Sequence, residues 1–455
     1  DRNFGKRNLM NSNRLLIRNA TILTVNDQNQ VINSGFLFIE HNLISEIGRM
    51  DEPIFSSLSH SLPASEQFDA SGMVIMPGLI NGHTHAAMTI FRGLADDLPL
   101  KSWLEDHIWP AEAAFINETN VEIGTKLAVA EMLLSGTVSF ANMYFFEEIT
   151  AKICKSAGIR VLLGEALLDF PTPSCQTNTE TFNRTESLLT RYKNDSLIRV
   201  SVALHSPYAC SPELLSKANR FALEHNIPVQ IHLSETENEE REIQAKYVLS
   251  ATGLIEKAGL LRPNVIASHV IHPDKYDLDR LISSNVGIVH NPRSNMKLAS
   301  GFANTEYITD NSSLFSFGTD SAASNNTLDL FKEMNASALV SKLISNNPMA
   351  MNSKKIVRSA TIGGALTLGV GQYTGSLEKG KWADLIFIDF NAPHLTPCFD
   401  YYSHLVYAVN STDVKHVMIN GSFIVVNRKI IGLDQTECIE KANQLSKNLA
   451  HLAQH

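Results

Sequence analysis

The 455-residue chain has few cysteines and no long apolar segment. These two features argue against a disulfide-bonded secreted protein and against a membrane-spanning protein. Its five cysteines, at positions 154, 175, 210, 398 and 438, are scattered and form no C-x-x-C pair. Scattered cysteines of this kind are expected to be reduced thiols, as in a reducing compartment, and not to form a framework of disulfides. No run approaches the roughly 18 apolar residues of a membrane span, and the polar, basic start lacks the apolar core of a signal peptide. We therefore expect a cytoplasmic protein without membrane attachment.

The chain also has fewer basic than acidic residues. It contains 38 Lys and Arg residues and 47 Asp and Glu residues, which gives a net charge of −9. A general nucleic-acid binder needs a basic surface, so nucleic acid is not the expected partner. Hydrophobic residues make up 44% of the chain and charged residues 19%, as in a globular protein with a large core. A small-molecule substrate is the expected partner.

The middle of the chain alternates β-rich and helical segments. The expected strands are 74–81, 137–143, 159–168, 198–204, 229–233, 265–270, 286–289 and 315–318. Helical periodicity is found at 120–135, 149–157, 180–192, 212–225, 241–259 and 277–284. Eight strands with helical crossovers over about 250 residues indicate a (β/α)8 barrel of the TIM type. An open, doubly wound sheet is the alternative.

Short β-rich segments lie on both sides of this block, at 15–25, 35–39 and 43–47 before it and 383–389, 414–421 and 423–427 after it. The two ends of a domain often lie close together, so these segments can pair into one small composite β-sandwich. The predicted organisation assigns 1–75 to the first part of the sandwich, 76–374 to the barrel, and 375–455 to the second part with a terminal helix.

Histidines gather where the expected barrel strands end. The first strand leads into His83-Thr84-His85, and residues two apart on an extended chain point to the same face. The later strand ends carry His205, His232, His269, His290 and Asp320. Catalytic groups of such barrels lie at the C-terminal strand ends. The chain has only 16 histidines, so this concentration indicates one site.

Four of these residues, His83, His85, His232 and Asp320, form a ligand set for one divalent ion. Imidazole is the commonest ligand of zinc and also suits iron, and a catalytic site keeps one position open for water. An ion held there activates water at neutral pH. Glu235 is placed to shuttle a proton, and His269 to hydrogen-bond the attacking oxygen.

Each of these residues also has an ordinary structural alternative. Asp320 can cap a helix that begins near Ala323. Glu235 lies in an acidic segment that is typical of an exposed helix start. His205 and His290 can be hydrogen-bonded loop residues. Their joint occurrence at successive strand ends favours the catalytic interpretation.

Long motifs around these residues resemble the amidohydrolase superfamily. They are PGLINGHTH at 77–85, HLSE at 232–235, SH at 268–269 and GTD at 318–320. Residues 91–112, 291–301 and 321–326 are similar to the branch that holds S-adenosylhomocysteine/5′-methylthioadenosine deaminases and triazine (ATZ/TRZ) hydrolases. The likeness covers nearly the whole chain and includes the composite sandwich. Such folds commonly self-associate, so a homo-oligomer is expected by analogy.

The resemblance implies one Zn²⁺ per subunit on the four ligands, with Fe²⁺ as the alternative metal. Glu235 then serves as the proton shuttle, with His269 and Asp320 orienting the water. Binuclear relatives carry a bridging lysine at the end of strand four, where this chain has Ala203-Leu-His-Ser-Pro. One metal is therefore expected.

The resemblance also implies a nucleoside pocket. Glu112 matches the carboxylate that takes the ribose hydroxyls, with an ordinary helix-start Glu as the alternative. His205 matches the histidine that contacts the purine. Trp103 and Trp109 are expected to wall the pocket or to pack in the core.

One departure concerns the 5′ substituent of the nucleoside. Deaminases of S-adenosylhomocysteine are expected to offer an arginine near the end of strand three, where this chain has Glu165. Arg160 and Arg293 are substitutes at other positions. The predicted enzyme is a zinc-dependent hydrolytic deaminase of 5′-methylthioadenosine and/or S-adenosylhomocysteine, yielding the inosine analogue and ammonia. The rivals are a hydrolase of another amino- or halo-heterocycle (guanine, cytosine or triazine type) and a non-catalytic assembly protein.

Overall fold

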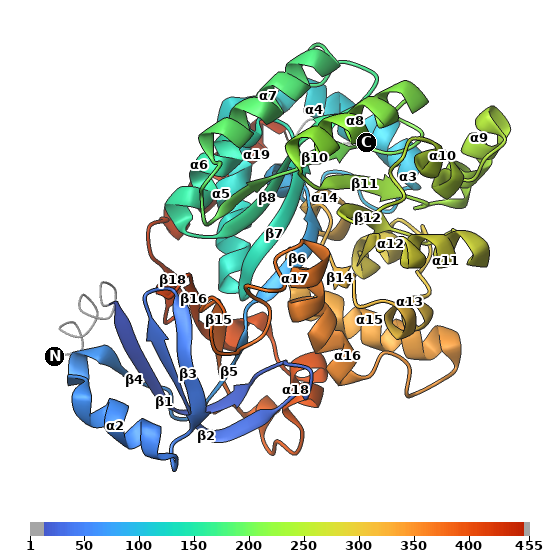
Figure 1. Cartoon of the computed structure of the whole chain (residues 1–455). Coiled ribbons are helices and arrows are strands. Elements are labelled where there is room, and N and C mark those ends of the chain that lie inside the picture. Colours follow the sequence, from blue (N-terminus) through green and yellow to red (C-terminus); the bar gives the residue numbers. More distant parts are fainter. Residues whose placement is uncertain (1–12, 450–455) are drawn as a thin grey trace.

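The computed structural model describes residues 13–449 and places eight parallel strand positions in one barrel, which confirms the predicted fold (Figure 1). The strands are β6 (Leu79–Thr84), β7 (Thr137–Tyr144), β8 (Arg160–Leu167), β9 (Ile198–Val200) with β10 (Val202–Leu204), β11 (Val229–Leu233), β12 (Val265–His269), β13 (Gly287–His290) and β14 (Phe315–Phe317). They follow one another around the barrel in chain order. The C-terminal ends of all eight positions therefore face one side.

The barrel closes through a short seam between its first and last strands. A bridge pairs Thr84 with Asp320, whose backbone N–H donates to the His83 carbonyl at 3.0 Å. The Asn81 amide completes the seam, since its Nδ2 donates to Thr319 Oγ1 at 2.8 Å and its Oδ1 accepts the Thr319 N–H at 3.0 Å. This closure places the first and last predicted ligands side by side.

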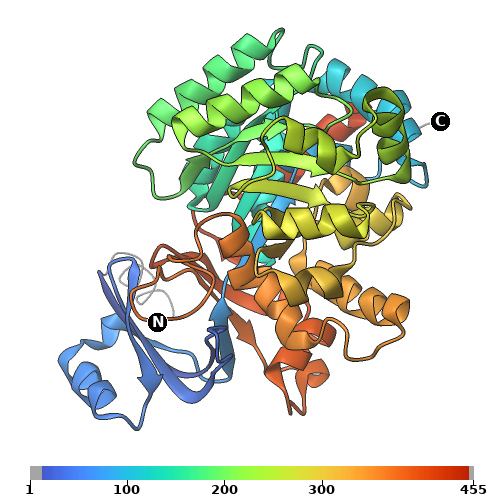
Figure 2. The same cartoon turned by 45° about the vertical axis from the view of Figure 1, so that its right-hand side comes forward.

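Helices surround the strands, as Figure 2 shows for the half of the barrel that comes forward. The predicted crossovers are α5 (Glu118–Leu134), α6 (Glu147–Ala157), α7 (Asn178–Arg191), α8 (Pro212–His225) and α11 (Lys275–Ser283). Local sequence explains α8, because the Ser211 side chain accepts the Leu214 N–H, Pro212 starts the helix, and Asn226 leaves it at φ 51°. Within residues 13–449, none of the helices has the length and apolar character that crossing a bilayer requires.

Several helices differ from the prediction. The expected helix at 241–259 is two helices, α9 (Glu237–Tyr247) and α10 (Ala251–Lys257). Val248 ends α9 at φ 57°, and the Ser250 side chain caps α10 by accepting the Gly253 N–H. The capping serine decides the break, although Val248 and Leu249 continue the apolar pattern. Helices that the pattern did not predict include α12 (Pro292–Lys297), α13 (Thr305–Asn311), α15 (Leu330–Ser345) and α16 (Ser353–Arg358).

The two ends of the chain build one mixed sheet, seen in Figure 1 as blue and red strands below the barrel. Its order is β18-β17-β16-β15-β5-β1-β2-β3, with β4 paired to β1. The strands are β1 (Arg14–Leu23), β2 (Val31–Glu40), β3 (Leu43–Arg49), β4 (Gln67–Asp69), β5 (Met73–Pro77), β15 (Leu385–Asp389), β16 (Val414–Ile419), β17 (Ser422–Val426) and β18 (Lys429–Ile430). The terminal helix α19 (Gln435–Leu449) packs against α5.

The predicted strand 74–81 is wrong as a single element. Its first half is β5, which pairs with β1 and β15 in the mixed sheet, and its second half is β6 of the barrel. Gly78 makes the crossing, and a Cβ added there would lie 2.2 Å from Val138 Cγ1. The apolar residues on both sides of Gly78 are buried, so hydrophobicity gives no sign of the change of sheet.

Candidate active site

Three histidines and one aspartate converge at the C-terminal end of the barrel. His232 Nε2 lies 3.1 Å from His83 Nε2 and 3.2 Å from His85 Nε2. Asp320 Oδ1 lies 3.5 Å from His83 Nε2 and 3.3 Å from His85 Nε2. Strands β6 and β11 and the end of β14 supply these groups, as the spacing predicts. The three imidazole nitrogens thus lie close enough to share one ion, and Asp320 Oδ1 lies beside two of them.

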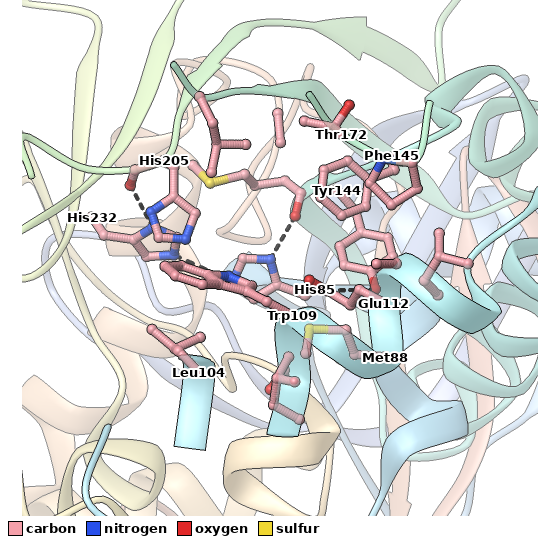
Figure 3. A pocket seen from close by; sticks show the side chains of 18 of the residues that line it. His85, Met88, Leu104, Trp109, Glu112, Tyr144, Phe145, Thr172, His205 and His232 are labelled. Carbon is pink, nitrogen blue, oxygen red and sulfur yellow. Dashed lines mark hydrogen bonds between the residues drawn. The ribbon is translucent and has the colours of Figure 1, made fainter. Parts of the chain in front are cut away.

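The donor chemistry of this cluster fits a divalent cation. His85 Nδ1 lies 2.5 Å from the Met143 carbonyl, and His232 Nδ1 lies 2.6 Å from the His205 carbonyl (Figure 3). Each Nδ1 therefore carries the proton and donates it, so the unprotonated Nε2 atoms face one another. Such lone pairs repel unless a cation lies between them. Tetrahedral zinc with bonds of about 2.0–2.1 Å holds nitrogens roughly 3.3 Å apart, close to the observed spacing.

Burial favours the neutral, metal-binding form of two of the three histidines. It lowers the pKa of His83 to about 4 and that of His232 well below its ordinary value. For His85 burial also lowers the pKa, but the neighbouring Asp320 carboxylate outweighs it, so the pKa of His85 is raised. Burial raises the pKa of Asp320, but the adjacent His83 and His85 rings outweigh it and hold that pKa well below normal. Neutral imidazoles and an ionised carboxylate are the required ligand states.

Asp320 is not a helix cap. The helix that follows it, α14 (Ala322–Asn325), is capped by Ser321, whose side chain accepts the Ser324 N–H. Oδ2 of Asp320 instead accepts hydrogen bonds from Ser294 Oγ at 2.6 Å and Ser324 Oγ at 3.1 Å. These bonds turn Oδ1 toward the histidines.

Glu235 is buried beside the histidine cluster and is not an exposed helix start. Its Oε2 lies 3.7 Å from His269 Nε2, and its Oε1 accepts from Ser300 Oγ at 3.5 Å. Thr236 caps α9, and Glu239 turns back to accept the backbone N–H groups of Ser234 and Glu235. Burial raises the pKa of Glu235. A carboxyl whose pKa moves toward neutrality is suited to proton transfer.

The strand ends that carry the site have unusual backbone conformations. Ser234, His269 and Asp320 adopt positive φ angles of 51°, 76° and 58°. Such angles are uncommon for residues with a Cβ and often mark functional sites. His269 is also held through its ring, because its Nδ1 lies 2.7 Å from Asn295 Oδ1. This contact directs Nε2 toward Glu235.

A cavity of about 530 Å³ opens over the cluster. His205 and Trp109 line it, with ring centroids 6.3 Å apart, and His205 lies 5.0 Å from the ring of His232. Burial lowers the pKa of His205 to about 3, so its ring is neutral. Glu112 lines the cavity from α4 (Trp109–Phe115), and its Oε1 accepts the Tyr144 hydroxyl at 2.7 Å (Figure 3). A metal cluster and a buried carboxylate thus share one pocket.

Comparison with known proteins identifies the family. The amidohydrolase family matches residues 74–424, the greater part of the chain. The chain belongs to that family. The prediction of an amidohydrolase enzyme is thereby confirmed, and the ligand cluster fits the metal dependence of this class.

Individual proteins and solved structures are also similar to this amidohydrolase over almost its full length. A protein of Syntrophobacter fumaroxidans named 5-methylthioadenosine/S-adenosylhomocysteine deaminase is 42% identical over 435 residues, covering 96% of this chain and 98% of that protein. A 5′-deoxyadenosine deaminase of Methanococcoides burtonii is 38% identical over 96% of this chain and 98% of its own. A zinc-bound adenosine deaminase structure from Xanthomonas campestris matches with a TM-score of 0.92 and 33% identity, covering 96% and 98% of the chains.

Arg293 and Arg160, the two arginines considered as substrate contacts, lie outside the cavity. Arg293 does not line the cavity, because its Nε donates to Asn325 Oδ1 at 3.1 Å and lies 3.7 Å from Glu333 Oε1. Arg160 begins β8 at the opposite end of the barrel and forms a buried, two-bond ion pair with Asp384. Both guanidinium groups pair with nearby polar side chains.

Glu165 is turned away from the cavity as well. Its oxygens accept the backbone N–H groups of Phe146 and Glu147 and the Ser174 hydroxyl. Glu165 therefore does not line the cavity, and this position still offers no arginine to an amino-acid carboxylate. Among residues 13–449, no lysine or arginine lines the cavity.

No sequence pattern pointed to Tyr144 and Asn295, which hold Glu112 and His269. Tyr144 ends β7 in a run of buried aromatic residues that is typical of core. Asn295 lies within a motif, but nothing in its spacing connects it to His269. Only the folded amidohydrolase brings these partners together.

The Glu112 carboxyl predicts a pH effect on folding. Burial raises its pKa from 4.5 to about 7, against the lowering effect of the Tyr144 hydrogen bond. Between these values the folded chain keeps a proton that the unfolded chain loses, so stability falls as pH rises and levels off above about 7. The loss approaches about 3 kcal/mol for this group. Thermal unfolding of metal-free Glu112→Gln should show a smaller fall in Tm between pH 5 and 8 than wild type, and an identical fall contradicts the assignment.

Proposed function

We propose that this amidohydrolase is a zinc-dependent hydrolytic deaminase that converts a 5′-substituted adenosine to the inosine analogue and ammonia. The observation that carries the proposal is Glu112, a buried carboxylate in the same cavity as the histidine cluster. A carboxylate accepts hydrogen bonds from the two neighbouring hydroxyls of a ribose. A triazine or a free base offers no such diol. The names of the relatives that are 37–42% identical support the same substrate class.

The catalytic chemistry follows from the positions of the charged groups. A divalent ion, when bound by the cluster, lowers the pKa of water and supplies a nucleophile near neutral pH. Glu235 takes one proton from the attacking water and delivers it to purine N1. It then takes the second proton from the hydroxyl now on C6 and passes it to the amine, which leaves as ammonia while the C6 carbonyl forms. His269, whose Nε2 lies 3.7 Å from Glu235 Oε2, orients the attacking oxygen. His205 and Trp109 enclose the base.

The cavity favours an uncharged 5′ substituent. In the described part of the chain, no lysine or arginine lines it to pair with an amino-acid carboxylate, whereas Phe145, Ile116 and Phe170 offer apolar surface. Moving a carboxylate from water into a pocket where it has no partner makes binding less favourable. We therefore propose methylthioadenosine as a better substrate than S-adenosylhomocysteine. A relative named 5′-deoxyadenosine deaminase indicates that a small apolar 5′ group occurs among the substrates of similar enzymes.

Ammonia release by zinc-loaded protein tests the proposal across methylthioadenosine, 5′-deoxyadenosine, S-adenosylhomocysteine, guanine, cytosine and a chlorotriazine. We expect the first two compounds to react fastest. Glu112→Ala should lower kcat/KM for them by about 10–100-fold, because a hydrogen-bonded charge is lost. Glu118→Ala, at an exposed position of α5, is the control and should leave turnover unchanged. Silence on every adenosine with turnover of another heterocycle would reject the substrate class.

A further inference from the structure

The end of strand β7 contacts the metal-side residues of the site. Asn142 Oδ1 accepts the Ala86 N–H at 2.8 Å and the Thr84 hydroxyl at 3.1 Å. The next residue, Met143, offers its carbonyl to His85 Nδ1 at 2.5 Å. These bonds fix both the loop after β6 and the orientation of a ligand imidazole. Strand β7 therefore determines where the His85 ring lies.

The following residue of the same strand contacts the substrate side. The Tyr144 hydroxyl donates to Glu112 Oε1 at 2.7 Å, and both side chains are buried (Figure 3). Among residues 13–449, Tyr144 is the hydrogen-bond partner found for this carboxylate. One hydroxyl thus connects the α4 carboxylate to the barrel, while Oε2 remains for a ligand.

Tyr144 is itself held firmly. Its backbone N–H donates to Glu147 Oε1 at 3.1 Å, and Asn142 Nδ2 donates to the same oxygen at 2.7 Å. Its ring packs on Phe145 with centroids 4.8 Å apart. A side chain fixed by packing and by neighbouring hydrogen bonds can hold a second group accurately. Tyr144 meets this requirement.

We propose that Tyr144 is a positioning residue that holds one oxygen of Glu112 and directs the other toward the vicinal hydroxyls of the ribose. Because adjacent residues of β7 hold His85 and Glu112, this strand end sets the spacing between the metal centre and the sugar. The inference rests on the proposed function, in which Glu112 binds ribose. It adds a residue that acts on substrate only through that carboxylate.

A positioning role of this kind predicts a particular kinetic pattern. The ribose contact is the same before and during reaction at C6, so its weakening raises KM and leaves kcat nearly unchanged. We expect Tyr144→Phe to raise KM for methylthioadenosine about tenfold, as for one lost hydrogen bond to a charged group, with kcat within about threefold of wild type. Zinc content should not change.

A double-mutant cycle tests whether Tyr144 acts through Glu112. In a Glu112→Gln background, Tyr144→Phe should raise KM by less than about twofold. The 2′,3′-dideoxy analogue of methylthioadenosine, which lacks both hydroxyls, should react equally with wild type and Tyr144→Phe. Tyr402→Phe removes a buried phenol hydroxyl outside the cavity and is the matched control, expected to match wild type.

Different failures have different meanings. If wild-type protein turns over no adenosine, the proposed function and this inference both fall. If methylthioadenosine reacts normally but Tyr144→Phe leaves KM unchanged, or lowers kcat at constant KM, only the positioning role is rejected. An equal rise in KM with and without Glu112 also rejects it, because the effect then bypasses the carboxylate.

Discussion

Replacing Glu235 with glutamine is expected to lower kcat by about 10³-fold while the protein keeps its fold and its metal. Glutamine has the same shape and accepts the same Ser300 hydrogen bond, but it cannot carry a proton between water and the purine. General acid–base groups contribute about 10²–10⁴-fold to rate. Steady-state kinetics on methylthioadenosine, with zinc content measured on the same sample, gives the result.

The control for this variant lies two residues away. Glu237 is exposed at the start of α9, so Glu237→Gln should leave kcat unchanged. An unaltered kcat in Glu235→Gln would exclude the proton shuttle. Loss of zinc together with activity would instead indicate that Glu235 is a ligand.

Removal of the metal is the second large effect that we expect. Dialysis against a chelator should reduce turnover to background, and about one equivalent of Zn²⁺ per chain should restore it, with Fe²⁺ as the alternative ion. Without the ion, unshared lone pairs of His83, His85 and His232 face one another, so metal loss should also lower Tm. Metal analysis and thermal unfolding of the two forms measure both effects.

Ligand and non-ligand histidines give the matched comparison. His232→Gln should lose tight zinc binding, whereas His225→Gln, on the outer helix α8, should retain one ion per chain. A His232→Gln protein that binds one ion as tightly as wild type would reject the ligand set. Two tightly bound ions in wild type would reject the mononuclear prediction.

The sequence predicted the parts of this enzyme that depend on local pattern. Strand periodicity and the polar residues at strand ends led to the barrel and placed His83, His232 and Asp320 at one side of it. The long motifs indicated the family, which the comparisons confirm. Local pattern failed at Gly78, because the chain changes sheets between two equally apolar segments.

Tertiary partners account for the remaining errors. Arg293 looked available to a substrate because its charge was considered alone, yet the fold pairs its guanidinium with Asn325 and Glu333. Tyr144 looked like core because it lies among aromatic residues, and its hydroxyl finds Glu112 across 32 positions. Hydrogen bonds between distant residues leave no periodic signal in a single sequence.

The seam that closes the barrel has a consequence for how the chain matures. The Asn81–Thr319 contacts join residues 238 positions apart, and the same seam brings His83 and His85 to Asp320. A nascent chain whose last strand has not docked lacks one of the four donors. We therefore expect full affinity for the ion only after the barrel has closed. A bound ion should in turn favour the closed barrel, because it binds the folded state.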